Sequence, residues 1–98
     1  MTHAVFHSVA RRELEEAIDY YNAERQGLGS EFREEVQRVL ALLSSFPRLG
    51  QPVRGSVRRM MLSRFPYGIY YRPLSPNTLR ILAVAHNRRR PESWAGRR

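Results

Sequence analysis

The sequence predicts an α+β domain in which a helical hairpin packs on an antiparallel sheet, in the order β-α-α-β-β-β. Two observations carry this prediction. Between residues 14 and 43 the apolar residues recur every three to four positions, as they do in amphipathic helices. After residue 57 they alternate with polar residues or form short continuous runs, as they do in strands. With 98 residues in all, one domain over 1–98 is expected, ending in an arginine-rich tail at 87–98.

The first elements are a short strand and a helix. Residues 3–7 form a short alternating segment, and Ser8 stands where the N-cap of a helix is expected, because its hydroxyl can accept a hydrogen bond from the first turn. The helix that follows places its apolar residues on one stripe, at Leu14, Ala17, Ile18 and Tyr21.

A second helix follows the turn made by residues 27–29. It is expected to begin near Ser30, which can cap it, and to carry acidic residues in its first turns, where the helix dipole favours them. It must end before Pro47, because a residue that precedes proline is pushed out of the α region. Its apolar stripe comprises Phe32, Val36, Val39, Leu40 and Leu43.

The second half of the chain predicts a loop at residues 47–52 and then an antiparallel meander of three strands. These strands are expected over residues 57–65, 67–72 and 78–86, with a proline-asparagine turn before the last of them. Strict alternation in the last strand would place Ile81, Ala83 and Ala85 on one face and Leu82, Val84 and His86 on the other. Both faces are then apolar, so this strand is predicted to be central and covered on both sides.

Composition excludes several classes of protein. The chain has no cysteine, which rules out disulfides and cysteine-ligated zinc. His3 and His7 would lie about 13 Å apart along a strand, too far for one ion, and we expect neither a metal nor a cofactor. No apolar run is long enough for a membrane span or a signal peptide, so a cytoplasmic protein without a membrane partner is expected. No serine-histidine-aspartate set or flanking pair of carboxylates is suggested either.

The charge is positive and unevenly distributed. The formal net charge is +8, and residues 1–49 hold six arginines and eight acidic residues, whereas residues 50–98 hold eleven arginines and one acidic residue. Lysine is absent. Arginine binds phosphate or carboxylate through two parallel hydrogen bonds, which favours a surface that recognises nucleic acid or an acidic protein segment. A genomic bias toward arginine codons explains the same composition equally well.

The candidate binding residues therefore lie on the basic sheet and tail. Tyr67 and Tyr71 share a face with Ile69 and are interpreted as core residues, whereas Tyr70 lies on the opposite face and is the better candidate for an exposed aromatic. The full set predicted to contact a target or partner is Arg59, Arg64, Tyr70, Arg80, His86, Arg88, Arg89, Arg90 and Trp94.

The chain resembles a known family through its order of elements and a set of short segments. These segments are Glu13-Leu14-Glu15-Glu16-Ala17, Tyr20-Tyr21, Leu28-Gly29, Phe32, Pro47, Gly50, Pro52, Phe65-Pro66-Tyr67, Tyr70-Tyr71, Ala83-Val84-Ala85-His86, Arg88, Pro91 and Trp94. Together they are similar to the RelE/ParE superfamily of toxins from type II toxin-antitoxin systems, over nearly the whole chain.

The resemblance implies one of two activities. RelE-like members cut messenger RNA on the ribosome without a metal, and their pattern, placed on this sequence, requires basic residues at 59 and 61, arginine at 68 and 88, and tyrosine at 94. Three of these positions hold Met61, Gly68 and Trp94 instead, and an indole cannot do the proton transfer of a phenol. If the chain is a ribonuclease, the catalytic candidates are Arg59, Arg88 and His86, with His86 as the titratable group.

ParE-like members, which poison DNA gyrase and are not nucleases, resemble this chain better. The sequence therefore predicts a ParE-like toxin without catalytic residues, with DNA gyrase as its target. The alternatives are a RelE-like ribonuclease acting on ribosome and messenger RNA, and a basic nucleic-acid-binding module without toxicity. A toxin of either kind implies a cognate antitoxin, which can dock as a helix in a groove or add a strand to the sheet.

Overall fold

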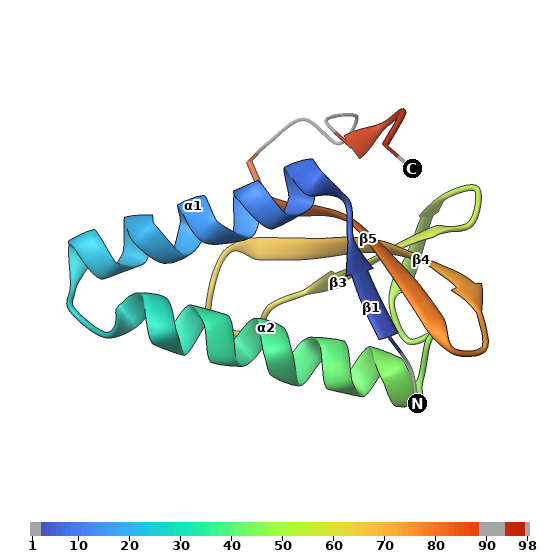
Figure 1. Ribbon diagram of the computed structural model, residues 1–98, viewed down its shortest axis with the longest axis horizontal. Helices are drawn as coiled ribbons and strands as arrows, with labels where there is room; N and C mark the ends of the chain where they lie inside the picture. Colours follow the sequence, from blue (N-terminus) through green and yellow to red (C-terminus); the bar gives the residue numbers. More distant parts are fainter. Residues whose placement is uncertain (1–2, 89–93, 98) are drawn as a thin grey trace.

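Two antiparallel helices cover one face of a five-stranded sheet (Figure 1). The computed structural model describes residues 3–88 and 94–97. Within them the elements are β1 (His3–Phe6), α1 (Ser8–Glu24), α2 (Leu28–Ser45), β2 (Gln51–Arg54), β3 (Val57–Met61), β4 (Tyr67–Ser75) and β5 (Thr78–His86). In the part of the chain that the structure describes, neither helix is long and apolar enough to cross a bilayer.

The sheet confirms the predicted fold class and adds one strand to it. Its order is β1-β5-β4-β3-β2, with antiparallel pairing from β2 through β5. β1 pairs in parallel with β5, so the sheet is mixed. The expectation that residues 47–52 form a loop is wrong at its end, because Gln51 and Pro52 belong to β2. Proline is tolerated there because β2 is an edge strand, whose outward amide has no ladder partner to lose.

Both helices begin differently from the sequence prediction. His7, not Ser8, caps α1, and its Nδ1 accepts a hydrogen bond from the Val9 amide at 3.1 Å. Helix α2 begins at Leu28, two residues before Ser30, after Gly27 has turned the chain with φ 90°. Ser30 is not needed as a cap, because Asn22 of α1 accepts the Gly29 amide hydrogen bond at 2.8 Å.

Two of the predicted strands have different ends. β3 stops at Met61 and does not reach residue 65, because the amides of Ser63 and Arg64 bond to the Glu35 carboxylate and not to a neighbouring strand. β4 continues beyond residue 72 to Ser75, where the predicted turn connects it to β5.

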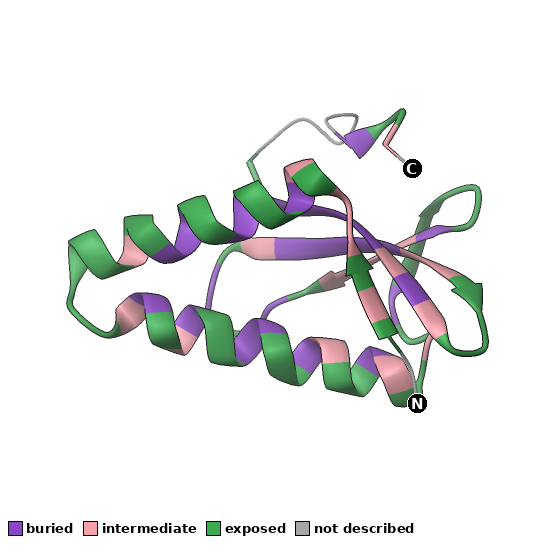
Figure 2. Cartoon of the chain, viewed as in Figure 1, coloured by how far each residue is buried: buried purple, intermediate pink, exposed green. Residues whose placement is uncertain are grey.

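The sheet has a different apolar cluster on each face. The larger one joins the helices to the sheet and contains the predicted stripes, with Tyr21 and Leu40 half-buried at its margin (Figure 2). The smaller one lies on the opposite face, which we call the outer face. It consists of Val57, Tyr70, Leu82, Ala83, Ala85 and Trp94.

An irregularity in β5 changes which side chains face outward. Tyr70 pairs with Ala83 and Tyr71 pairs with Ile81, so Leu82 is an extra residue without a partner in β4. Such a bulge shifts the alternation by one residue. Ala83 and Ala85 therefore join the outer cluster while Ile81 and Val84 face the helices. The strict alternation predicted for this strand is wrong from Leu82 onward, whereas its central position is confirmed.

Two adjacent leucines of α2 test the placement of the helix on the sheet. Leu43 is fully buried and Leu42 is 40% exposed. We expect Leu43→Ala to lower the free energy of unfolding by about 2–5 kcal/mol, because it leaves a cavity in the core. Leu42→Ala, the matched control, should change it by less than about 0.5 kcal/mol. Urea denaturation measures both, and similar losses for the two variants would contradict the observed orientation of α2.

Candidate partner-binding site

Tyr70 and Trp94 form a stacked aromatic pair on the outer face. Their ring centroids lie 5.6 Å apart with an interplanar angle of 29°. Tyr70, predicted to be an exposed stacking partner, is only 8% exposed because Trp94 covers it, and Trp94 itself is 6% exposed. Neither ring is therefore free to stack on a nucleic acid base, and both contribute to the outer apolar cluster.

The segment that carries Trp94 is fastened to the sheet by a buried ion pair. Arg97 Nη1 and Nη2 donate to the two carboxylate oxygens of Glu13 at 2.9 and 3.2 Å. Nη1 also donates to the carbonyl of Leu82 at 3.0 Å, and Glu13 accepts the amide of Val84 at 3.0 Å. The carbonyl of the bulged residue Leu82 and the amide of Val84 thus both have hydrogen-bond partners outside the sheet. Residues 94–97, within the expected arginine-rich tail, are consequently packed against the sheet.

Sequence reasoning missed Glu13 and Arg97. A signal for Glu13 was present, because it falls on the same helical stripe as Ala10, Leu14 and Ala17, where a carboxylate must be paired to be buried. Its partner is 84 residues away along the chain and had no such signal.

Arg64 is engaged with α2. Its guanidinium bonds to Glu31, which also binds Arg25 at 3.1 Å. These arginines hold the pKa of the Glu31 carboxyl below its ordinary value. One turn further along α2, Glu35 accepts a hydrogen bond from the Arg64 amide. Arg64 therefore helps to fix the β3–β4 connection, and any contact it makes with a partner would compete with Glu31.

Arg59 and His86, proposed above as groups of a ribonuclease site, lie on opposite faces of the sheet. Arg59 pairs with Tyr70, on the outer face. His86 pairs with Tyr67, and their rings meet edge to face at 5.3 Å on the helix side. The Arg88 amide donates to His86 Nδ1 at 3.1 Å, and Arg88 is exposed. Arg89 and Arg90 lie outside the described residues.

Three further arginines, Arg54, Arg72 and Arg80, lie on the strands at the basic side of the molecule. Arg80 of β5 pairs with Arg72 of β4, and Arg54 lies on β2. All the acidic residues that the structure describes lie on α1 and α2. The charge asymmetry of the sequence thus becomes an asymmetry between the two faces of the sheet. Within residues 3–88 and 94–97 no group of three histidine or acidic side chains is placed to hold a metal ion.

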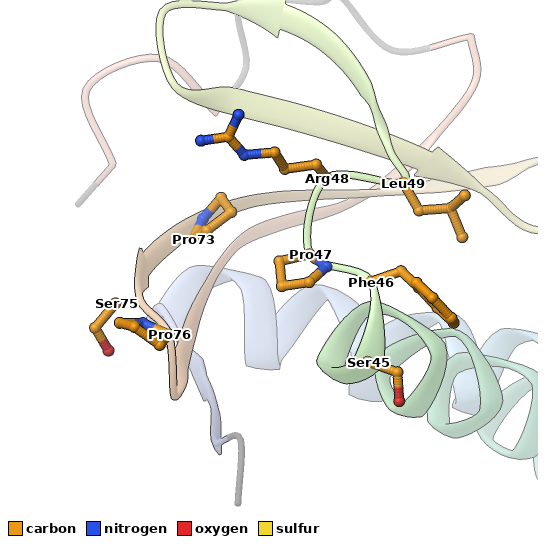
Figure 3. Close-up of a pocket in the computed structure, with 8 residues that line it drawn as sticks. All are labelled: Ser45, Phe46, Pro47, Arg48, Leu49, Pro73, Ser75 and Pro76. Atoms are coloured by element: carbon orange, nitrogen blue, oxygen red, sulfur yellow. The ribbon is translucent and has the colours of Figure 1, made fainter.

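An apolar groove of about 640 Å3 lies between the C-terminal end of α2 and the β4–β5 turn. Pro47 lies between the two walls, with Pro73 and Pro76 on one side and Phe46 and Leu49 on the other (Figure 3). Phe46 is 60% exposed and Leu49 is 48% exposed. Large apolar side chains exposed together in this way mark an interaction surface.

Tyr71 holds one wall of this groove in place. Its hydroxyl accepts the Gly50 amide at 2.9 Å and donates to the Pro47 carbonyl at 2.6 Å. A Cβ on residue 50 would lie 2.6 Å from this hydroxyl, so only glycine fits. Burial raises the pKa of Tyr71, which remains a neutral donor at physiological pH. Arg58 adds a bond from Nη1 to the Gly50 carbonyl at 2.8 Å.

Comparison with known proteins decides the family. A sequence model of the ParE toxin of the type II toxin-antitoxin system parDE matches residues 4–91. The chain belongs to the ParE toxin family. Among solved structures, the chromosomal ParDE toxin-antitoxin system from P. aeruginosa matches with a TM-score of 0.63 and 18% identity, over 88% of this chain and 96% of that one. This similarity supports the fold. A search of curated proteins gives no match.

Family membership confirms the resemblance seen in the sequence, and it confirms the choice of the ParE-like branch for this chain. The protein is thus a toxin-family member of a type II toxin-antitoxin system. The segments that carried the resemblance now have structural explanations: Pro47, Gly50 and Tyr71 form the bonded wall of the groove, and Glu13 and Trp94 fasten the C-terminal segment.

The Glu35 carboxylate gives a testable pH dependence. Burial raises its pKa, but hydrogen bonds from Ser63 and the Arg64 amide outweigh burial, so the pKa lies below its ordinary value. A lowered pKa in the folded state stabilises the fold above the ordinary pKa, and this contribution is lost as pH falls through the folded value. We expect Glu35→Gln to lower the free energy of unfolding at pH 7 by about 1–3 kcal/mol.

The difference between Glu35→Gln and wild type should shrink as the pH falls below about 4.5. Glu34→Gln removes an exposed carboxylate from the adjacent position and serves as the control, with an effect below about 0.5 kcal/mol. Urea denaturation at several pH values checks both variants. A Glu35→Gln difference that is constant across this range would show that ionisation of Glu35 does not contribute to stability.

Proposed function

We propose that this chain is a ParE-like toxin that inhibits DNA gyrase, so that cleaved DNA accumulates, and that a cognate antitoxin neutralises it. The observation that carries the proposal is the match of the ParE toxin model to residues 4–91. The ParDE system of P. aeruginosa, which shares the fold, supports an antitoxin as the partner. Inhibition of a protein target requires binding surfaces and no reacting groups on the toxin, and the site described above fits that requirement.

The placement of the ribonuclease candidates argues against RNA cleavage. A general acid-base group and the cation that stabilises the reacting phosphate must both lie within contact distance of one scissile bond. Arg59 lies on the outer face and His86 on the helix face, with the sheet between them, so of the two candidate cations only Arg88, whose amide donates to His86, lies beside it. Trp94, at the position where the ribonuclease pattern has tyrosine, is buried against Tyr70.

The apolar groove is the proposed docking site of the antitoxin. An amphipathic segment would place apolar side chains against Phe46, Leu49 and the prolines, where burial of apolar surface supplies the affinity. An acidic residue on the same segment can meet Arg48, which lines the groove and whose side chain extends away from Pro47 in Figure 3. Groove docking is favoured over strand addition at β2, because Pro52 and a bulge interrupt that edge.

A reconstituted assay tests the target. Purified toxin should increase the amount of DNA that gyrase leaves cleaved, and it should leave ribosome-bound messenger RNA intact. Primer extension measures the second outcome. Codon-specific cuts that are lost in His86→Ala would establish a ribonuclease and overturn the gyrase proposal.

The same assay tests the groove. Phe46→Ser combined with Leu49→Ser should keep the effect on gyrase and require at least about tenfold more antitoxin for neutralisation, since removing two buried apolar anchors costs more than 1.4 kcal/mol of binding. Tyr20→Ser, which changes an exposed aromatic on α1, is the control and should be neutralised like wild type. Equal neutralisation of all three proteins would remove the groove from the antitoxin interface.

A further inference from the structure

A second pocket, of about 380 Å3, lies on the basic side of the molecule beside the C-terminal segment. Arg54 and Ser56 from the β2–β3 hairpin line one side, Arg72 lies on β4, and Trp94, Gly96 and Arg97 line the other side. Its lining contains none of the large exposed apolar residues of the described chain. The pocket is therefore chemically different from the apolar groove at Phe46 and Leu49.

Two arginines of this pocket, Arg54 and Arg72, lie along one line across the sheet with Arg80, which lies beyond the pocket. Arg54 pairs with Val57, the register of β3 and β4 places Val57 opposite Arg72, and Arg72 pairs with Arg80. Strands are spaced about 4.8 Å apart, so Arg54 and Arg80 lie about 14 Å apart at the backbone. The line runs across the strands and not along them.

The positive charge of the pocket is not balanced by the protein. The side chains of Arg54 and Arg72 have no hydrogen bond or ion pair with another described residue, and Arg97 is the one pocket arginine whose side chain binds a carboxylate. Arg72 Nε and Trp94 Nε1 are buried donors without an acceptor among the described residues. Arg72 directly opposite Arg80 is a like-charge pair, which destabilises a sheet. Packing and pairing within the fold do not explain Arg54 and Arg72.

An anionic ligand with its charge spread along a line would explain them. Guanidinium groups bind phosphate oxygens through two parallel hydrogen bonds, and successive phosphates of a nucleic acid backbone supply anions at regular spacing. A protein partner would need apolar anchors at the centre of its interface, and this pocket offers none to it. A peptide added to the sheet would run along the strands, whereas the arginines cross them.

We propose that this pocket, with Arg54 and Arg72 as its principal cations, binds phosphate groups of a DNA backbone. Arg80 extends the contact toward β5, and the outward surface of the C-terminal segment forms the rim. Binding of this kind reads no base sequence, because the stacked pair of Tyr70 and Trp94 is covered and offers no ring to a base. The inference goes beyond gyrase inhibition and does not depend on it.

Fluorescence anisotropy with a labelled mixed-sequence duplex of about 20 base pairs, between about 50 and 200 mM salt, tests the proposal. Wild type should bind with an affinity that falls steeply with salt. Arg54→Gln combined with Arg72→Gln should bind at least about tenfold more weakly at the lowest salt, and its log–log salt slope should be shallower by about 1.8, since each lost phosphate contact removes about 0.9. Emission of Trp94, the only tryptophan, should change on DNA addition and locate the contact.

Arg12→Gln combined with Arg38→Gln removes the same charge from exposed positions on the two helices and is the matched control. It should bind within about threefold of wild type and keep most of the salt slope. Arg54→Gln alone changes an exposed side chain that has no hydrogen bond or ion pair with a described residue, so it keeps the test valid if the double variant does not fold. Its slope should be shallower by about 0.9.

Three results would overturn the proposal. The first is wild type that does not bind the duplex at about 50 mM salt. The second is a variant with both Arg54→Gln and Arg72→Gln that binds the duplex with the affinity and the salt slope of wild type. The third is poly-glutamate displacing the duplex as effectively as unlabelled DNA of equal charge, which would assign the pocket to an acidic protein. A toxin that binds DNA through this pocket and leaves gyrase unaffected would uphold this inference and overturn the function proposed above.

Discussion

The buried carboxylate of Glu13 is the constraint on which the outer half of the molecule depends. A charge in an apolar stripe is unfavourable unless it is paired and hydrogen-bonded, and Glu13 meets this requirement with the Val84 amide and with Arg97. Arg97 then also binds the Leu82 carbonyl. One side chain of α1 thereby fixes the bulge in β5 and the segment that carries Trp94. Loss of either charge would leave the other without its ion-pair partner, held only by uncharged groups such as the Val84 amide or the Leu82 carbonyl.

This arrangement separates the surfaces that the protein can offer to partners. The helices carry the described acidic residues and cover one face of the sheet, so the opposite face is basic. Trp94 covers the Tyr70 ring on that face, and arginines lie beside the stacked pair. The apolar groove is built separately, by the loop that Tyr71 and Arg58 hold against the β4–β5 turn. A protein segment and a phosphate backbone therefore have chemically distinct places to bind.

Local patterns in the sequence were sufficient to predict the helices, the meander and the family. They failed where a distant partner decided the outcome. Pro52 favours a loop, yet β3 recruits it into an edge strand. The alternation in β5 is broken at Leu82, where Glu13 and Arg97 supply partners for the flanking backbone. Tyr70 has the pattern of an exposed residue and is buried because Trp94, 24 residues along the chain, folds back and stacks on it within the outer apolar cluster.

Accessibility of Trp94 to a quencher tests most directly whether Glu13 organises the outer face. The chain has one tryptophan, so its fluorescence reports this segment alone. In wild type, acrylamide should quench Trp94 poorly. Glu13→Leu should release Arg97, and Arg97→Leu should release the same segment while leaving the Val84 bond in place, so both should raise the quenching constant severalfold in protein that remains folded by circular dichroism. Folded variants in which Trp94 stays as shielded as in wild type would contradict the account.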